Sequence, residues 1–244
     1  MLRQWIGGLQ QWRQRQRSAA KFRRRQAWSQ GLSVAETFDK IYAEGKWGRA
    51  RNGAPFYSGD GSSAAMSRGY EDRVVDLISA DASLGTWVDI GCGDFQVASR
   101  ILARLDRPIG YTGVDVAGNV IGWHRDVHAR PGVAFAQCNA VDEDPPRADL
   151  VTIRQVLQHL SNGEIARILE RVRRLYRVAV ITESLPVRFV AANLDIAHGI
   201  AVRIPLGSGV YIDEPPFGLS VAVAFDSPYS EKEFLRTSVV RLAA

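Results

Sequence analysis

The sequence is poor in cysteine, and Cys92 and Cys138 are too few for a disulfide framework or a thiolate metal site. No apolar run approaches the roughly 18 residues that a membrane-spanning helix requires. The N-terminus lacks an apolar segment followed by a small-residue cleavage site, so we expect no secretory signal. His124 and His128 lie one helix turn apart without a third ligand, so no metal is expected. These absences predict a protein of a reducing, cytoplasmic compartment.

Acidic residues are absent from the first 35 positions, which hold eight basic ones. The formal charge of +5 therefore divides into +8 in this segment and −3 in the remaining chain. Apolar residues recur there at spacings of three and four, which predicts an amphipathic helix; they are Leu2, Trp5, Ile6, Leu9 and Trp12. Trp and Leu opposite Arg are typical of a helix that lies on an anionic membrane surface, here the inner membrane face. The alternative is an arm that packs on the body of the protein. We expect a basic arm over residues 1–34 and a catalytic domain over residues 35–244.

Strand-like and helical segments alternate through most of the remaining sequence. Strands are expected at 86–90, 111–116, 133–138, 149–156 and 177–183, and helices at 35–45, 67–80, 97–105, 119–129 and 163–176. This alternation predicts a parallel sheet with helices on both faces. Two tail segments, 209–225 and 236–242, have strand composition without a long helix between them. They predict an antiparallel hairpin at the sheet edge.

The first of these strands runs into two glycines, in the stretch VDIGCGDF over residues 88–95. Gly91 and Gly93 allow a tight turn against which a ligand can lie. Asp115 ends the next strand, where a carboxylate can accept hydrogen bonds from ribose hydroxyls. A dinucleotide fingerprint requires a further glycine where Gln96 stands, and Asp89 suits a positively charged sulfonium better than a pyrophosphate. The loop therefore predicts a nucleoside ligand and favours S-adenosylmethionine.

Four segments together resemble the successive motifs of class I S-adenosylmethionine-dependent methyltransferases: VDIGCGD, GVDV, ADLVTIRQVLQHLS and VAVITESLP. The likeness covers residues 36–240, and a bacterial subgroup is matched further by FDKIYAEGKWG, SGDGSS, RQVLQHLS and DEPPF. The resemblance implies an α/β, Rossmann-like methyltransferase fold. It also implies a mostly parallel seven-stranded sheet with helices on both faces and an antiparallel C-terminal edge hairpin. The implied cofactor is S-adenosyl-L-methionine.

By the same resemblance, Asp89 and the two glycines hold the methionine portion, Asp115 the ribose, and Asn139 the adenine, at a position where an acid is usual. Phe95 stands where the family commonly has a third glycine, which predicts a bulkier loop. SGDGSS is expected to close over the cofactor as a lid, the alternative being an ordinary surface turn. The cofactor-binding candidates are Ser58, Gly59, Gly61, Ser62, Asp89, Gly91, Cys92, Gly93, Asp94, Phe95, Asp115, Val116, Asn139, Ala140 and Arg154.

Methyl transfer from a sulfonium depends chiefly on alignment, and a base can assist. Arg154 can bind an anionic substrate, or form a salt bridge with Asp149 or Glu183. His159 is a candidate base or a locally packed residue, and Glu183 is a comparable base facing the same crevice. The segments flanking the lid and following the fifth strand supply the substrate-contact candidates, which are Trp47, Tyr57, Asn193, Asp195, Arg203 and Tyr211.

The leading hypothesis is a methyltransferase acting at an oxygen of a small-molecule, glycan or lipid-linked acceptor. A nicotinamide-dependent oxidoreductase is disfavoured by the missing third glycine. A non-catalytic nucleoside-binding module is disfavoured by the polar residues that end the fourth and fifth strands. No nucleic-acid-binding motif accompanies the basic arm, so a nucleic acid partner is not expected.

Overall fold

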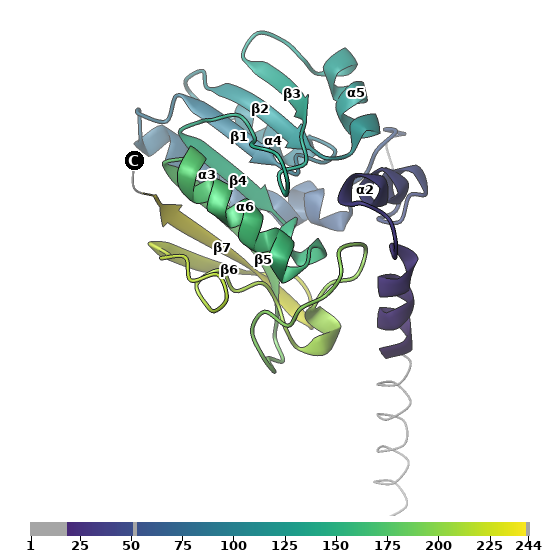
Figure 1. The fold of residues 1–244 in the computed structure, drawn as a ribbon. Coiled ribbons are helices and arrows are strands. Elements are labelled where there is room, and N and C mark those ends of the chain that lie inside the picture. The colour runs from purple at the N-terminus through teal and green to yellow at the C-terminus, as the bar shows by residue number, and fades with distance from the viewer. Residues whose placement is uncertain (1–18, 51–52, 243–244) are drawn as a thin grey trace, which may run out of the picture.

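The computed structural model describes residues 19–50 and 53–242 of the chain. Residues 1–18, which hold most of the predicted amphipathic helix, lie outside the described residues. Within the described part of the predicted arm, residues 19–28 are helical and lead into the domain (Figure 1).

Seven strands form one sheet in the order β3-β2-β1-β4-β5-β7-β6 (Figure 1). The strands are β1 (Thr86–Ile90), β2 (Gly110–Asp115), β3 (Val133–Gln137), β4 (Leu150–Arg154), β5 (Val178–Pro186), β6 (Val223–Pro228) and β7 (Glu233–Arg241). The first five are mutually parallel, whereas β7 is antiparallel to both β5 and β6. The predicted Rossmann-like fold with an antiparallel C-terminal hairpin is confirmed.

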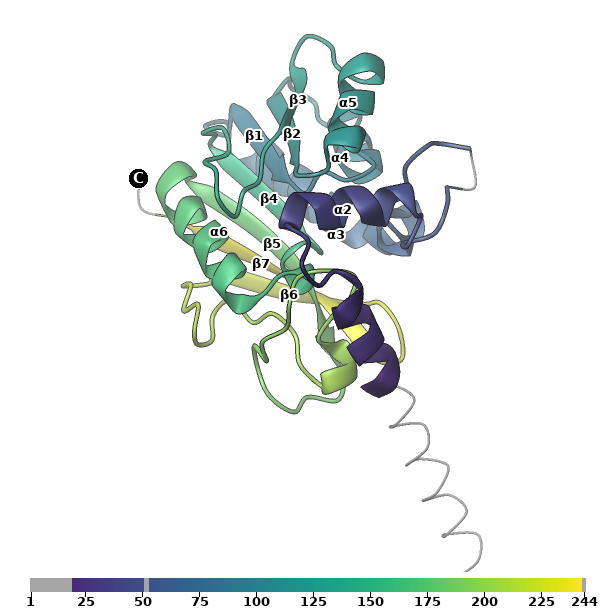
Figure 2. The ribbon, with the colours of Figure 1, turned by 45° about the vertical axis from the view of Figure 1, so that its right-hand side comes forward.

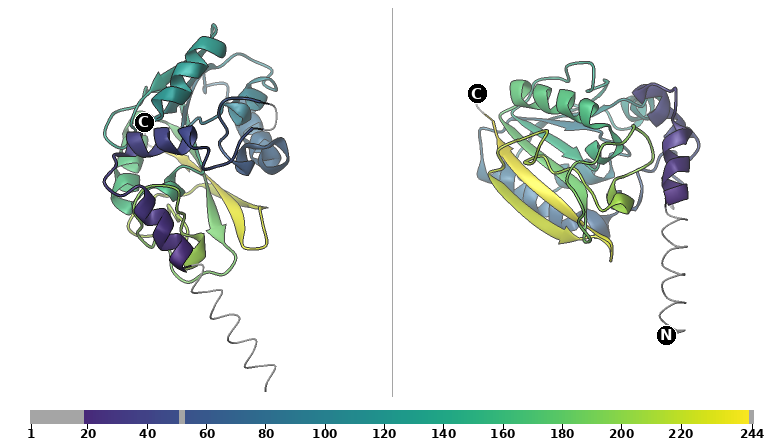
Figure 3. Two further views of the ribbon diagram at one scale, coloured as in Figure 1. Left: turned by 90° about the vertical axis from the view of Figure 1, so that its right-hand side faces the viewer. Right: turned by 60° about the horizontal axis from the view of Figure 1, so that its bottom comes forward.

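Helices cover both faces of this sheet, with α3 and α4 on one face and α6 on the other (Figure 3). The helices are α2 (Val34–Ala43), α3 (Ala64–Ala80), α4 (Gln96–Leu102), α5 (Gly118–Val127) and α6 (Asn162–Leu175), and the 3-10 helices are η1 (Asp60–Ser62), η2 (Leu157–His159) and η3 (Ile204–Leu206). Reciprocal capping boxes begin α2, with Ser33 and Glu36, and α6, with Ser161 and Glu164. These caps fix where both helices start beside the sheet's carboxyl edge.

The tail prediction was partly wrong, because only the last three residues of the expected strand 209–225 belong to β6. The backbone before β6 is instead held by Asn193, whose side chain accepts from the Tyr211 N–H (2.8 Å) and donates to the carbonyls of Tyr211 and Pro215 (2.9 Å each). Pro215 and Pro216 lack the N–H groups that a strand ladder needs. Apolar composition alone is therefore not sufficient to predict a strand over residues 209–222.

The described end of the predicted arm packs on the domain. Gln26 accepts a hydrogen bond from the Ala197 N–H (2.8 Å) and donates to its carbonyl (3.1 Å). Ser29 donates to the carbonyl of His198 at 2.7 Å. Figures 2 and 3 show this helix beside the connection that carries η3. Residues 26–29 thus brace the segment that follows β5.

Candidate functional site

A cavity of about 330 Å³ opens where the parallel strands end. At one end it is lined by residues that follow β2 and β3, including Val116, Asn139 and Ala140. At the other end lie Ser184 of β5 and Tyr229 from the turn between β6 and β7. The carboxyl edge of an open parallel sheet is where such folds bind ligands. All the cofactor-binding candidates except Phe95 line this one cavity.

The glycine loop after β1 has a backbone that only glycine fits. Gly91 and Gly93 have φ values of +74° and +54°. A Cβ on Gly91 would lie 2.3 Å from Val156 Cγ2, and a Cβ on Gly93 would lie 2.3 Å from Ser58 Oγ. The loop is thus pressed between the end of β4 and the segment before α3.

Asp115 fixes the same loop from the end of β2. Its carboxylate accepts hydrogen bonds from the N–H groups of Gly93 (3.1 Å) and Ala117 (3.0 Å). Burial raises the pKa of Asp115, and these two donors oppose that shift. The carboxylate therefore lies in the cavity wall, beside the glycine loop.

Phe95 does not make the loop bulkier on the ligand side, contrary to the expectation from the sequence. Its φ is +61°, a left-handed conformation that a third glycine would adopt without strain. The ring is 3% exposed and packs against Tyr111, Phe135 and His124, at centroid distances of 5.4, 4.9 and 5.9 Å. Phe95 therefore contributes to the core under the loop and does not line the cavity.

The SGDGSS segment lies on the glycine loop through reciprocal hydrogen bonds. Ser58 Oγ accepts from the Asp94 N–H at 2.8 Å, and the Ser58 N–H donates to Asp94 Oδ2 at 3.0 Å. Ser62 Oγ donates to the same Asp94 oxygen at 3.0 Å. Tyr42 of α2 contacts Ser58 Oγ at 3.0 Å. Four side chains therefore tie this segment, α2 and the glycine loop together.

Asp89 is a half-buried acid on β1, directly below the loop. It accepts hydrogen bonds from Thr152 (2.6 Å) and Tyr111 (3.2 Å). Burial raises the pKa of Asp89 to about 6, although both hydroxyl donors favour the carboxylate. The group can therefore present negative charge to the cavity near neutral pH.

Asn139 lies after β3, at the end of the cavity beyond Asp115. Its Oδ1 accepts from the Val141 N–H (3.2 Å) and its Nδ2 donates to Asp142 (2.8 Å). These local bonds orient the residue at the cavity wall, where Ala140 is its neighbour.

His159 ends η2, lines the cavity and is 9% exposed. Its Nδ1 donates to the carbonyl of Gly199 at 3.0 Å, which fixes the proton on that nitrogen. Burial lowers the pKa of His159 to about 4. The imidazole is therefore neutral at pH 7, with Nε2 unprotonated and 3.4 Å from Gln158 Nε2.

Glu183 does not face the crevice, and the expectation that it does was wrong. Its carboxylate accepts hydrogen bonds from the N–H groups of Val156 (3.2 Å), Leu157 (2.8 Å) and Gln158 (3.0 Å). Burial raises its pKa to about 8, while these donors and the Arg203 guanidinium favour the charged form. Glu183 therefore positions η2 and is absent from the cavity wall.

Only Trp47 of the six substrate-contact candidates lines the cavity. Arg203 is 1% exposed and donates to the carbonyls of Leu194 and Leu160, at 2.8 Å each, so it holds loops together. Asp195 accepts from the N–H of Asn162 at 2.7 Å, at the start of α6.

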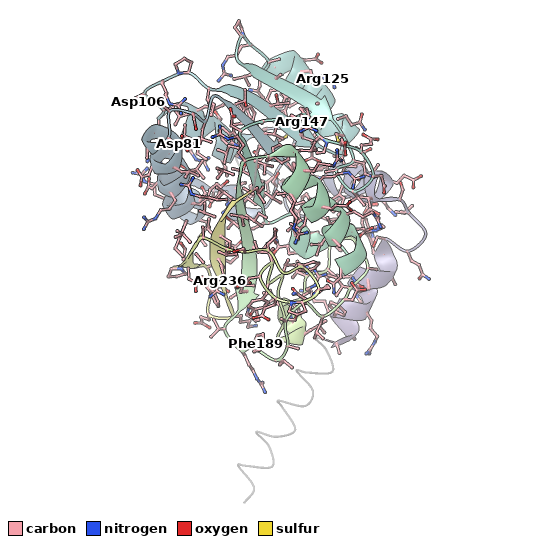
Figure 4. All side chains as sticks on the ribbon, turned by 60° about the vertical axis from the view of Figure 1, so that its left-hand side comes forward. Asp81, Asp106, Arg125, Arg147, Phe189 and Arg236 are labelled. Carbon is pink, nitrogen blue, oxygen red and sulfur yellow. The ribbon has the colours of Figure 1, made fainter. Side chains whose placement is uncertain are left out.

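The remaining three candidates also lie outside the cavity wall. Asn193 binds backbone, as described above, and Tyr57 donates to Asp60 at 2.6 Å. Tyr211 packs on Phe189 with ring centroids 5.5 Å apart. Figure 4 shows Phe189 at the outer edge of the molecule, and its side chain is 56% exposed. The structure therefore gives these residues local structural contacts.

Several residues that line the cavity were not predicted as site residues from the sequence: Arg25, Tyr42, Tyr70, Gln155, Ser184, Tyr229 and Glu233. Tyr229 and Glu233 reach the cavity only because β7 inserts between β5 and β6. No local motif marks such residues. Gln155 carried a signal, since it directly follows Arg154, a cofactor-binding candidate, at the end of the fourth strand.

Among the residues that the structure describes, no group of three His, Cys, Asp or Glu side chains could hold a metal ion. His124 instead donates from Nε2 to the carbonyl of Gly93 at 2.7 Å. No helix within residues 19–50 and 53–242 is long and apolar enough to cross a membrane.

Comparison with known proteins agrees with this architecture. Residues 88–178 match the family model of a methyltransferase domain. The chain is 25% identical over 165 residues to the indolepyruvate C-methyltransferase of Streptomyces griseus, covering 62% of this chain and 50% of that protein. The chain thus spans about half the length of this curated relative.

Solved structures share the fold at low sequence identity. Magnesium protoporphyrin IX methyltransferase from Synechocystis, with bound S-adenosylhomocysteine, has a TM-score of 0.55 and 16% identity and covers 86% of this chain and 98% of its own. The cyclase SpnF has a TM-score of 0.54 and 15% identity, covering 86% and 95%. The chain has the class I S-adenosylmethionine-dependent methyltransferase fold.

Proposed function

We propose that this protein transfers a methyl group from S-adenosyl-L-methionine to a small-molecule acceptor. The observation that carries the proposal is a single cavity joining Asp115 and the glycine loop to the ends of β4 and β5. One end of the cavity is lined by residues suited to a nucleoside, and the other end, at β4 and β5, is proposed to face the acceptor. Fold neighbours crystallised with S-adenosylhomocysteine or S-adenosylmethionine support the choice of cofactor.

In this proposal Asp115 binds the ribose hydroxyls, and Asn139 with Ala140 contacts the adenine. The glycine loop accepts the methionine portion, because Gly91 and Gly93 leave the backbone uncovered. Asp89 contributes negative charge beneath it, which suits a ligand with a sulfonium and an ammonium group. Ser58, Gly59, Gly61 and Ser62 cover the loop as the lid.

The reaction breaks the methyl–sulfur bond, leaves its electron pair on sulfur and forms a bond from the acceptor atom to the methyl carbon. Alignment of the two molecules supplies most of the catalysis. We propose oxygen as the acceptor atom, and a hydroxyl acceptor must also lose a proton. Glu233 is the carboxyl group at the acceptor end, and burial raises its pKa. It is better suited than His159, whose pKa of about 4 makes the imidazole a weak base.

The fold does not itself determine the reaction, because the cyclase SpnF shares it at a TM-score of 0.54. The curated relative is named as a C-methyltransferase of indolepyruvate. Carbon is therefore the competing acceptor atom. Glycan and lipid-linked acceptors rest only on the composition of the N-terminal arm, so a small molecule is the primary proposal.

Calorimetric titration of the full chain with S-adenosylhomocysteine, and separately with NADH, tests the proposal. Micromolar binding of the first ligand without binding of the second is expected. A folded protein that binds NADH and not S-adenosylhomocysteine would instead support the oxidoreductase.

A further inference from the structure

Arg154 ends β4 inside the cavity with part of its guanidinium unsatisfied. Its Nε and Nη2 atoms are buried and have no hydrogen-bond partner among the residues that the structure describes. The guanidinium carbon lies 5.3 Å from the ring centroid of Tyr70. The ring attracts the cation but provides no nitrogen or oxygen acceptor for the N–H groups. Two strong donors are therefore left without an acceptor.

The two salt bridges predicted for Arg154 from the sequence are not formed. Asp149 pairs with Arg177 at 3.3 Å and accepts from the N–H of Thr86 at 3.0 Å. Glu183 binds the backbone N–H groups of η2. Neither carboxylate is thus available to neutralise the guanidinium.

The two acids whose charges act on the guanidinium, Asp89 and Glu71, have hydrogen-bond partners of their own. Glu71 accepts from Arg100 Nε at 2.8 Å and from Ser67 at 2.7 Å. Asp89 accepts from Thr152 and Tyr111. No ion pair within the described part of the chain includes Arg154. An unpaired buried charge is costly, and orphaned buried donors call for an explanation such as a bound ligand.

The identity of the two free atoms indicates the shape of that ligand. Nε–H and Nη2–H lie on the same edge of the guanidinium and point in parallel, which matches the two oxygens of one carboxylate. We propose that Arg154 binds a carboxylate of a bound small molecule side-on through Nε and Nη2. The inference rests on the proposed function for its context, because that function supplies the molecules that the cavity holds.

Two carboxylates are available in that context: the one on the amino-acid portion of S-adenosylmethionine and one on the acceptor. The surroundings of Arg154 favour the acceptor. Together with Glu233, the residues Gln155, Ser184 and Tyr229 line the same end of the cavity, away from Asp115 and Asn139. Their amide and hydroxyl groups can bind further polar atoms of the same molecule. The acceptor is thus assigned to the class of small carboxylic acids.

The experiment compares wild type with Arg154→Lys, which keeps the charge without the planar fork, and Arg154→Gln, which removes the charge. Each protein is titrated with S-adenosylhomocysteine and with 5′-methylthioadenosine, which lacks the amino acid portion. Each is also titrated with benzoate and with its neutral analogue benzamide, alone and with saturating S-adenosylhomocysteine.

If the carboxylate belongs to the acceptor, both variants weaken benzoate binding about tenfold or more, whereas S-adenosylhomocysteine and benzamide bind as to wild type. If it belongs to the cofactor, the variants lose S-adenosylhomocysteine by about the same factor and keep 5′-methylthioadenosine. Either result supports the site and identifies the source. The proposal is overturned if both variants bind S-adenosylhomocysteine and benzoate as wild type does. It is also overturned if none of the three proteins binds benzoate and all bind S-adenosylhomocysteine equally.

A stability measurement separates a binding role from a structural one. Without ligand, Arg154→Met should melt at or above the wild-type temperature, because it removes an unpaired buried charge. A fall of more than about 4 °C would make Arg154 a structural residue. If wild type binds benzoate through Arg154 but not S-adenosylhomocysteine, the proposed function fails while the carboxylate site stands.

Discussion

Phe95, at the end of the glycine loop, and Gln155, directly after β4, adopt positive φ values of 61° and 56°. Each costs of the order of 1 kcal/mol or more, and such strain is concentrated at functional sites. The family resemblance marked the position of Phe95 as one where a glycine is common. It could not predict the direction of the Phe95 ring, which depends on packing with Tyr111 and Phe135.

His159 gives a pH dependence that can be checked by titration. Its folded pKa of about 4 is below the unfolded value of about 6.5, so the unfolded chain binds more protons between these values. The free energy of unfolding should therefore fall as pH decreases through this window, by about 2 kcal/mol from pH 7 to pH 5. His159→Asn keeps a donor for the Gly199 carbonyl and should lose this part of the dependence.

Urea denaturation of both proteins at pH 7 and pH 5 measures the difference. Asp89 works in the opposite direction, because its raised pKa of about 6 favours the folded state as pH falls. Comparing wild type with the variant cancels that contribution. Equal pH dependence in the two proteins would mean that His159 is protonated as readily in the folded state as in the unfolded chain.

Among the elements, those with a local signal were predictable and those set by distant pairing were not. The capping boxes at Ser33 and Ser161 mark the starts of α2 and α6 in the sequence. The apolar composition of β5 predicts a strand, and the structure buries β5 along its whole length. The place of β7 between β5 and β6 has no such signal. Tyr229 and Glu233 flank the β6–β7 turn, so their presence in the cavity could not be predicted either.

The segment carrying η1 should act as a lid held by Asp94. Asp94→Asn removes the negative charge and replaces one carboxylate oxygen by an NH2 group, so the side chain can no longer accept from Ser58, Ser62 and Gln96 with two oxygens. Dissociation of S-adenosylhomocysteine should become about tenfold faster, since the lid is released. Asp72→Asn, in the exposed pair with Arg104, is the matched control. Stopped-flow dissociation measures the rates, and identical rates in all three proteins would refute a lid.

The whole molecule carries opposite net charges in its two parts, +8 in residues 1–35 and −3 in the rest. We expect the full chain to sediment with phosphatidylglycerol vesicles at low salt and to be released at about 0.5 M salt, where charges are screened beyond a few ångströms. Phosphatidylcholine vesicles are the neutral control. Equal sedimentation with both kinds of vesicle, or with neither, would contradict an anionic surface as the arm's partner.

The central claim is that the strands end around a site for S-adenosylmethionine, with Asp115 on the ribose. Its most direct test is calorimetric titration of wild type, Asp115→Ala and the control Asp72→Ala with S-adenosylhomocysteine. Wild type and the control should bind alike, and Asp115→Ala should bind at least about tenfold more weakly, through loss of hydrogen bonds to a charged group. Equal binding by all three folded proteins, or by none, would contradict the account.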